Sequence, residues 1–284
     1  KYSIYDFNEY CRSSVMKYAD EWRRFIPMIG RWVDMKDDYK TMDVNYMESV
    51  WWVFKELWKK GLIYEGYKSM HICPHCGTTL SNFEVAQGYK DIKDISVTAK
   101  FELVDEPNTF VLAWTTTPWT LPGNVALAIG SHIHYIKIKS GNEYYVLAKD
   151  RFEVYKDLFT EPSITEEFKG KELIAKSYKP LFDYFVDKNL ENHENIYKIY
   201  DANFVTIEDG TGIVHIAPAF GEDDMNLGRE KKLAFIQHVN EQGKFTDDVK
   251  DFAGQYVKSK EYHQQTDIEV LKYLAVKNLI FNKE

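Results

Sequence analysis

The sequence has little of what marks a secreted or membrane-spanning protein. Its 284 residues include three cysteines, an odd number that argues against a disulfide framework and favours a reducing, cytoplasmic compartment. No run approaches the roughly eighteen apolar residues of a membrane span, and residues 1–6 do not have the layout of a signal peptide. There is no initiator methionine, so we expect an excised fragment of a longer protein that does not enter a membrane.

Positive charge is also scarce. The chain carries 36 lysine and arginine residues against 44 acidic ones, for a formal net charge of −8 at pH 7. Proteins that bind nucleic acids usually present a basic surface, so this balance disfavours a large RNA footprint. Short basic clusters do occur, around residues 55–60, 137–139, 169–179 and 229–232, and we expect most of them to be solvated faces. The hydrophobic share of 44% excludes a disordered chain.

Apolar residues recur at helical spacing in the first sixty residues and predict helices over 7–26 and 43–60. In the second of these, Asp43 is placed to cap the first turn and Gly61 to end the last one. An aromatic stripe runs along this helix, and we expect it to pack in a core: Met47, Val50, Trp51, Phe54, Leu57 and Trp58.

From about residue 88 the pattern changes to short β runs, expected over 96–104, 109–114, 135–138, 144–148 and 204–207. Helices are expected at 150–159, 223–233 and 266–277. Many short strands within one segment favour a closed barrel. We therefore predict an α+β fold with two domains. Residues 1–88 form a helical segment that ends in a cysteine knuckle, and residues 89–284 form a β-barrel with surrounding helices.

The knuckle is Cys73 and Cys76, followed by Gly77. Such a pair holds two thiolates at the separation that a tetrahedral zinc needs, but zinc takes four ligands. The remaining cysteine, Cys11, has no partner thiol, and nothing in the sequence specifies a neighbouring histidine as a ligand. We therefore expect half of a zinc site, empty unless residues outside this chain complete it. A zinc-ribbon interaction domain organised on this pair is an alternative.

Three successive hydroxyls, Thr115, Thr116 and Thr117, follow the strand expected at 109–114. Pro118 has no backbone N–H and residues 122–123 are a Pro-Gly turn pair, so the strand must end inside this stretch. Side chains at a strand end that opens into a loop often belong to functional sites. Hydroxyls there can hold a sugar hydroxyl, a carbonyl or a water, although threonines at strand ends are also common in structural positions.

A second stretch, 209–224, combines a tight turn, a short strand and an acidic helix start. Two glycines permit the turn, and residues 213–216 read as a strand that places His215 on the face opposite its two neighbours. The acids Glu222, Asp223 and Asp224 then open a helix. Taken alone, the histidine can equally be structural, and the acids can be helix-capping groups.

The residues from Trp114 to Asn124, Trp-Thr-Thr-Thr-Pro-Trp-Thr-Leu-Pro-Gly-Asn, resemble the threonine-rich editing motif of isoleucyl-tRNA synthetases. Leucyl and valyl relatives generally place arginine where this sequence has Thr117, which favours the isoleucyl family. Segments within 23–90 resemble that family's approach to its editing (CP1) insertion, and 209–224 resembles its second editing motif. The family's editing domain is similarly a β-barrel with helices around it.

The resemblance implies a proofreading enzyme that hydrolyses mischarged valyl-tRNA(Ile) and spares isoleucyl-tRNA(Ile). Its partner would be the 3′ end of tRNA(Ile), and aminoacyl-adenosine mimics would occupy the same pocket. No cofactor is expected for this hydrolysis, and we expect a monomer.

The resemblance also implies roles for individual side chains. The terminal adenosine, the ester and the attacking water would be held by three hydroxyls: Thr115, Thr116 and Thr117. The pocket and its loop would be shaped by three further residues: Trp119, Thr120 and Asn124. His215 would crowd the amino-acid side chain. Asp224, rather than its neighbour Asp223, would bind the α-ammonium through a charge-assisted hydrogen bond.

Two other features bear on this reading. Elements like His-Ile-Gly-His and Lys-Met-Ser-Lys-Ser, which the family uses for aminoacylation, are absent from the sequence, so we expect no aminoacyl-adenylate synthesis. ATP binding would belong to the full-length enzyme. The alternatives are a tRNA-binding fragment that is inactive alone, which the acidic balance favours, and the editing domain of a valyl or leucyl relative, which Thr117 and Trp119 oppose.

Overall fold

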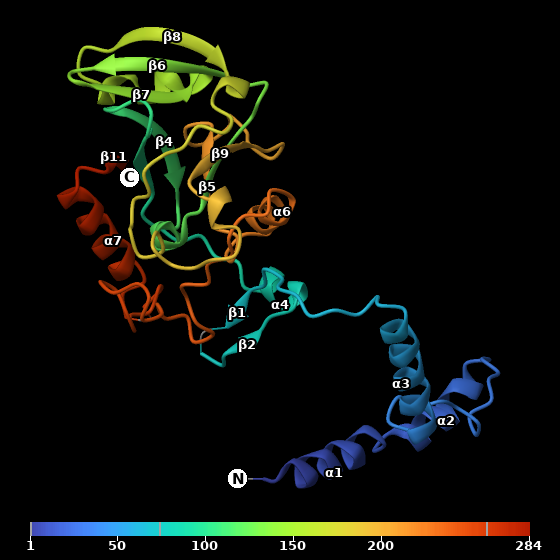
Figure 1. Cartoon of the computed structure of the whole chain (residues 1–284). Helices are drawn as coiled ribbons and strands as arrows, with labels where there is room; N and C mark the ends of the chain where they lie inside the picture. The colour runs from blue at the N-terminus through green and yellow to red at the C-terminus, as the bar shows by residue number, and fades with distance from the viewer. Residues whose placement is uncertain (1, 74, 260) are drawn as a thin grey trace. The chain divides into compact units, whose positions relative to one another are not determined.

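The computed structural model describes residues 2–73, 75–259 and 261–284, and the chain divides into two compact units, Lys1–Tyr67 and Lys68–Glu284 (Figure 1). This division falls before the cysteine knuckle, whereas the domain boundary expected near residue 88 falls after it. The assignment of 1–88 and 89–284 to separate domains therefore stays a prediction. No helix in the described part of the chain is long and apolar enough to cross a bilayer.

The first unit contains α1 (Ile4–Val15), α2 (Ala19–Met28) and α3 (Val44–Lys59). The single helix expected over 7–26 is wrong, because the chain leaves the helical path between Val15 and Ala19. Near this break the Ser13 hydroxyl donates to the Tyr10 carbonyl over 2.8 Å, a bond that competes with the helical ladder. The helix expected over 43–60 is confirmed as α3, which ends before Gly61 at φ +68°.

The aromatic stripe of α3 does not pack in a core. Trp51 is 68% exposed and Trp58 is 63% exposed, and no residue of α3 is buried. The stripe residues contact one another along the helix, with Phe54 lying between these two tryptophans. The predicted burial is therefore wrong within the first unit. A helix can bury its apolar face only against another element, and no other described residue of the first unit covers this face.

The second unit holds a hairpin, a six-stranded sheet and a three-stranded sheet. The hairpin pairs β1 (Ile72–Cys73) with β2 (Thr78–Thr79) and precedes α4 (Asn82–Gln87). The larger sheet has the order β11-β3-β4-β7-β6-β8 and the smaller one the order β10-β5-β9. The strand bounds are β3 Val97–Glu102, β4 Thr109–Thr115, β5 Ala126–Ile129, β6 His134–Ser140, β7 Glu143–Ala148, β8 Ser163–Lys169, β9 Lys198–Asp201, β10 Ile213–Ile216 and β11 Ile280–Lys283.

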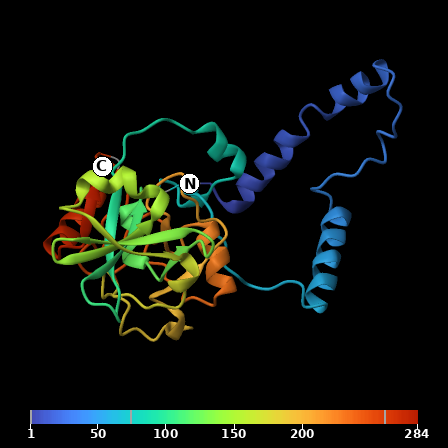
Figure 2. The ribbon, with the colours of Figure 1, turned by 90° about the horizontal axis from the view of Figure 1, so that it is seen from above.

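Short helical segments connect these strands. The α-helices are α5 Phe152–Tyr155, α6 Glu222–Glu230 and α7 Gln265–Val276. The 3₁₀ segments are η1 Pro118–Gly123, η2 Lys149–Arg151, η3 Lys156–Leu158, η4 Gly170–Glu172 and η5 His193–Asn195. The helices expected near 150–159, 223–233 and 266–277 are thus confirmed. Figures 1 and 2 show α6 and α7 on opposite sides of strands β4 and β5.

The α+β class is confirmed, but the closed barrel is wrong. Neither sheet of the described residues closes on itself. The strands that closure of the larger sheet would have to join are β8 and β11, and they pair with β6 and β3 respectively, not with each other. The smaller sheet is centred on β5, which pairs in parallel with β9 and antiparallel with β10. The strand β5 is therefore paired along both of its edges.

Most of the expected strands are present. Those at 96–104, 109–114, 135–138, 144–148 and 213–216 correspond to β3, β4, β6, β7 and β10. The run at 204–207 is wrong: Val205 N–H instead bonds to Ala202 O in a turn. Sequence reasoning missed β5, β8, β9 and β11. All four residues of β5 are buried, so its sequence lacks the alternation that reveals a half-buried strand, whereas β8 is an exposed edge.

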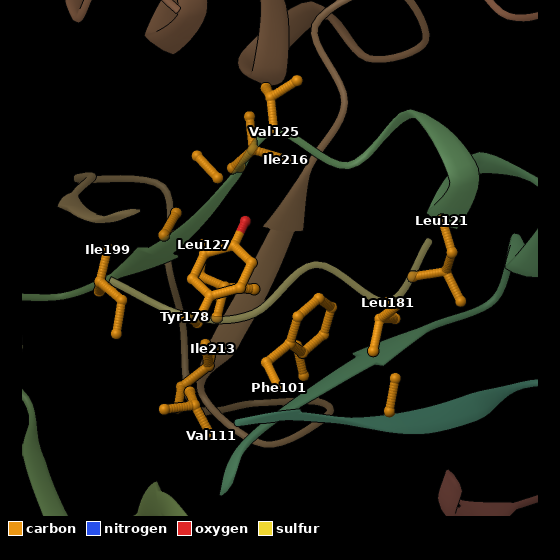
Figure 3. Packing of buried hydrophobic residues seen from close by; sticks show 14 of the residues in the cluster. Phe101, Val111, Leu121, Val125, Leu127, Tyr178, Leu181, Ile199, Ile213 and Ile216 are labelled. Atoms are coloured by element: carbon orange, nitrogen blue, oxygen red, sulfur yellow. The ribbon is translucent and has the colours of Figure 1, made fainter. Parts of the chain in front are cut away.

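Both sheets contribute to one hydrophobic core (Figure 3). Phe101 and Val111 come from the larger sheet, Leu127 and Ile213 from the smaller one, and Tyr178 from a connecting loop. Two buried hydroxyls tie the loop before β10 to the larger sheet. Thr211 Oγ1 donates to Leu112 O over 2.6 Å, and Tyr135 OH donates to Gly212 O over 2.7 Å. The end of β4 and the start of β10 are thereby fixed side by side.

Candidate functional site

A cavity of about 320 Å³ lies where the end of β4, the loop before β10 and the start of α6 meet. Residues 114–117 form one wall, residues 209–215 form another, and the start of α6 contributes Asp224. Thr116 and Asp224 line the same hollow, as the sequence predicted. Two stretches that lie far apart in the chain are therefore brought to one site.

The threonine stretch forms a hydrogen-bonded turn. β4 ends at Thr115 and η1 begins at Pro118, and between them Thr117 N–H donates to Thr115 Oγ1 over 3.1 Å. Thr117 Oγ1 lies 3.3 Å from Thr115 Oγ1 and 3.4 Å from Thr120 Oγ1. Thr116 differs from these three, because its side chain is exposed and has no hydrogen-bond partner among the described residues. Its hydroxyl is therefore available to a ligand in the cavity.

Thr120 and His215 join the two stretches directly, because Thr120 Oγ1 lies 2.9 Å from His215 Nε2. Thr120 Oγ1 also donates to Thr117 O over 2.8 Å. A hydroxyl has one proton to donate, so both contacts are satisfied together when His215 Nε2 carries a proton and donates to Thr120. The other ring nitrogen, His215 Nδ1, is then an acceptor, and it has no hydrogen-bond partner among the described residues.

Burial holds His215 neutral. The ring is buried, and loss of solvation lowers the pKa of His215 to about 4, with the neighbouring His238 adding a smaller effect in the same direction. The same cause lowers the pKa of His238 to about 4. A neutral imidazole that is pinned by Thr120 acts as a fixed wall of the cavity and not as a cation.

Asp224 is the acidic group of the cavity. Its Oδ1 accepts from Ala217 N–H over 2.7 Å, which directs the carboxyl toward the end of β10. Burial raises the pKa of Asp224 to about 6, and the negative charge of Asp223 contributes to the increase. A β-carbon at Gly221 would lie 2.2 Å from Asp224 Oδ2, so this carboxyl position requires glycine at residue 221. A partly desolvated carboxylate is suited to binding a ligand cation.

Three of the sequence-predicted site residues do not line the cavity. Asp223 is exposed on the first turn of α6. Asn124 is buried in the frame, where Nδ2 donates to Ala126 O over 2.8 Å and Oδ1 accepts from Tyr178 OH over 2.6 Å. The Trp119 ring packs edge-on against Phe220 at 5.4 Å. Asn124 and Trp119 lie behind the walls of the cavity, and the direct roles of all three residues in substrate binding stay predictions.

Sequence reasoning found the turn that forms the second wall but named none of its residues as site residues, and it missed the group that holds the turn in place. Residues 209–212 line the cavity, with Gly210 and Gly212 at φ +61° and +73°. Arg151 supports this loop by donating from Nε to Gly210 O over 2.7 Å and from Nη1 to Glu208 O over 2.9 Å. The Asp-Gly-Thr-Gly pattern indicated the turn, but no signal in the sequence linked a distant arginine to it.

The cysteine knuckle keeps the spacing of half a zinc site. Cys73 Sγ and Cys76 Sγ lie 3.8 Å apart, and two thiolates bound to a tetrahedral ion at about 2.3 Å would be separated by about the same distance. Gly77, at φ +67°, donates its N–H to Cys73 O and closes the turn. No group of three or more His, Cys, Asp or Glu suited to a metal occurs among the described residues. Zinc binding completed from outside the chain stays a prediction.

Comparisons with known proteins place the chain in a family. The family of tRNA synthetases class I (I, L, M and V) matches residues 1–217. The chain belongs to these class I tRNA synthetases. This synthetase chain is 43% identical over 293 residues to the "Probable isoleucine--tRNA ligase, cytoplasmic" of Dictyostelium discoideum, covering 99% of the chain and 27% of that protein. It is 42% identical over 285 residues to the isoleucine–tRNA ligase of Bacillus thuringiensis, covering 100% of the chain and 26% of that protein.

The synthetase chain thus spans about a quarter of the length of the curated relatives that it matches. Among solved structures, the editing domain of the cytosolic leucyl-tRNA synthetase of P. falciparum is similar at a TM-score of 0.38 and 13% identity. That match covers 49% of this chain and 67% of the other. A likeness of this size decides neither fold nor function, so the site must be argued from its own geometry.

The hydrogen bonds of the site predict the protonation of His215. We expect the imidazole to be neutral, with its proton on Nε2, from pH 7 down to about pH 5, because burial keeps its pKa below that range. Two-dimensional ¹H–¹⁵N spectra of the ring nitrogens measure this directly. Thr120→Ser, which keeps the hydroxyl, should preserve the tautomer, whereas Thr120→Val should change the Nε2 shift. A protonated ring at pH 6 would contradict the expected burial.

Proposed function

We propose that this chain is the editing part of an isoleucine–tRNA ligase and that its cavity hydrolyses the ester bond of mischarged valyl-tRNA(Ile). The observation that carries the proposal is the meeting of Asp224 with Thr116 in one cavity. An aminoacyl ester has an ammonium next to its carbonyl carbon. The carboxylate on one side of the cavity can bind the ammonium, and the hydroxyls on the other side can bind the ester carbonyl.

Asp224 would bind the α-ammonium. A charge-assisted hydrogen bond is about twice as strong as a neutral one, and partial burial strengthens it further. Its second role is orientation, because a bound ammonium would fix the carbonyl relative to the threonine wall. Positioning of this kind is a large part of catalysis for an ester, which is already activated.

The attacking group would be a water. Thr120 is the hydroxyl that lies next to a histidine, but its proton is directed to Thr117 O and His215 donates to it. An activated nucleophile needs the opposite arrangement, in which the hydroxyl donates to an unprotonated nitrogen. The hydroxyl of Thr116 has no partner among the described residues and would hold the water or the ester carbonyl.

Substrate choice would follow from the fixed wall at His215. A hydrophobic pocket gains about 1–3 kcal/mol from one methylene, and isoleucine against valine is the standard instance of this limit. A second pocket that is too small for isoleucine supplies the missing discrimination, because overfilling a packed site costs a similar amount. His215 is buried and pinned by Thr120, so it cannot swing aside at low cost.

Two neighbouring acids give a matched test of the site. Asp224→Asn should lower kcat/KM for valyl-tRNA(Ile) deacylation about 10- to 100-fold, because the charged partner of the ammonium is lost. Asp223→Asn, on the exposed side of the same helical turn, should stay within about threefold of the wild type. Release of free valine from the purified chain measures both. Equal losses in the two variants would remove Asp224 from its assigned role.

Failure of the wild-type chain to release valine, with tRNA binding retained, would instead support the inactive tRNA-binding fragment.

A loss of activity in Asp224→Asn can be distinguished from a loss of folding. Because burial raises the pKa of Asp224, its ionised form lowers stability as pH rises from about 4 to about 6. Asp224→Asn should therefore be no less stable than the wild type at about pH 8.

His215→Ala should open the pocket to isoleucine. We expect deacylation of isoleucyl-tRNA(Ile) to rise at least about tenfold, because the steric cost of one extra methylene, about 1–3 kcal/mol, is removed. Hydrolysis of valyl-tRNA(Ile) should persist, since the carboxylate and the Thr116 hydroxyl remain. Both substrates are assayed side by side. A variant that still spares isoleucyl-tRNA(Ile) would show that another residue excludes the larger side chain.

The pH dependence should report Asp224. The ionised carboxylate binds the ammonium, so kcat/KM should rise with pH through the free-enzyme pKa of about 6 and level off above it. In Asp224→Asn the residual kcat/KM should no longer rise with pH over this range. The measurement is a profile of kcat/KM for valyl-tRNA(Ile), made at constant ionic strength. An unchanged rise in the variant would assign the ionisation to another group.

A further inference from the structure

The peptide units on either side of Trp119 are held by two buried polar groups. Trp119 N–H donates to Asp267 Oδ1 over 3.1 Å, and Trp119 O accepts from His238 Nε2 over 3.0 Å. Asp267 lies in the first turn of α7 and His238 in the loop after α6, and both are 0% exposed. Neither residue lines the cavity. Their contacts reach the site through the backbone of η1.

The segment η1 depends on such outside support. Pro118 and Pro122 have no N–H to donate, so two of its six residues cannot contribute a backbone donor. The bond from Thr120 N–H to Thr117 O, 2.9 Å, spans Trp119. Any shift of Trp119 therefore moves the flanking hydroxyls of Thr117 and Thr120 together.

Asp267 is itself fixed by charge. Its second oxygen, Oδ2, accepts from Lys258 Nζ over 2.6 Å, and Lys258 Nζ also donates to Asp94 Oδ2 over 2.6 Å. Burial raises the pKa of Asp267, and the Lys258 ammonium opposes the increase. A buried carboxylate with two donors has little freedom to rotate, because losing either one would leave a buried charge or N–H unpaired.

His238 is positioned equally closely. Its ring contacts the edge of Phe220 with centroids 4.6 Å apart, and it stacks on Phe245 at 5.7 Å. A β-carbon at residue 123 would lie 2.3 Å from His238 Nδ1, so the ring fits against η1 because residue 123 is glycine. Since a carbonyl only accepts, the contact with Trp119 O requires the proton on Nε2.

We propose that Asp267 and His238 are positioning residues that hold the Trp119 backbone and thereby set the places of the Thr117 and Thr120 hydroxyls for ester hydrolysis. The inference rests on the proposed function and adds residues that do not line the cavity. A displacement of about 1 Å at reacting groups can cost roughly 100-fold in rate, so a small shift of the Trp119 backbone would be enough to slow the reaction.

Asp267→Asn tests the first group. Both partners of Asp267 are donors, and an amide has one acceptor oxygen where the carboxylate has two, so one partner must face an NH₂ group. We expect faster amide hydrogen exchange in the peptide that covers residues 116–124, with unchanged exchange in β3 and β4. We also expect kcat for valyl-tRNA(Ile) to fall about 10- to 100-fold with KM within about threefold.

Asp94→Asn is the matched control. It alters the outer partner of Lys258 and leaves both contacts of Asp267 in place, so exchange in 116–124 and kcat should stay close to the wild type. For His238, the conservative change His238→Gln keeps a side-chain donor and should retain most of the activity. His238→Leu removes the donor and should lower kcat and speed exchange in the same peptide.

Each outcome has a defined meaning. Unchanged exchange over 116–124 in both Asp267→Asn and His238→Leu would overturn the backbone clamp. Faster exchange with unchanged kcat would overturn its link to the reaction. A wild-type chain that releases no valine would refute the proposed function together with the catalytic part of this inference, while the exchange data would still decide the clamp.

Discussion

The hydrogen bond between Thr120 and His215 is the constraint on which the site depends. It joins η1, which follows the larger sheet, to β10 of the smaller sheet, across a gap of 95 positions in the chain. Both partners are buried, and a hydrogen bond is stronger where the local dielectric is low. The shared core and the bonds of Thr211 and Tyr135 bring the two functional stretches together. The contact between Thr120 and His215 then fixes how the threonine turn and the histidine are oriented within the cavity.

The sequence predicted the chemical groups of the site better than it predicted the arrangement of the elements that hold them. The threonine stretch and the acidic helix start were recognisable because proline, glycine and acids mark the ends of elements locally. Their convergence was inferred from the family resemblance. The clamp on Trp119 was not predictable, since Asp267 and His238 are ordinary residues whose importance appears when α7 and the loop after α6 pack against η1. A hydrogen bond between residues that are far apart in the chain produces no periodic pattern in the sequence.

The fold errors also have physical causes. Spacing of short strands does not say whether a sheet closes, and here β8 and β11 remain open edges of the described sheet. The strand β5 was missed because a fully buried strand has no alternating pattern. The stripe on α3 was read as core because its spacing is helical and apolar, but periodicity identifies a face without identifying what covers it. Asn124 was expected to shape the pocket and its loop; its amide bonds to Ala126 and Tyr178 in the frame, and its role in substrate binding stays a prediction.

Gly221 shows how a residue without a side chain can limit what the protein tolerates. A β-carbon there would lie 2.2 Å from Asp224 Oδ2, so the carboxyl of Asp224 would have to move. Even alanine, the smallest replacement, would push the charge away from the hollow while leaving both sheets untouched. Such a change would be invisible to most measures of structure, because it displaces the oxygen atom of one carboxyl and no strand of either sheet.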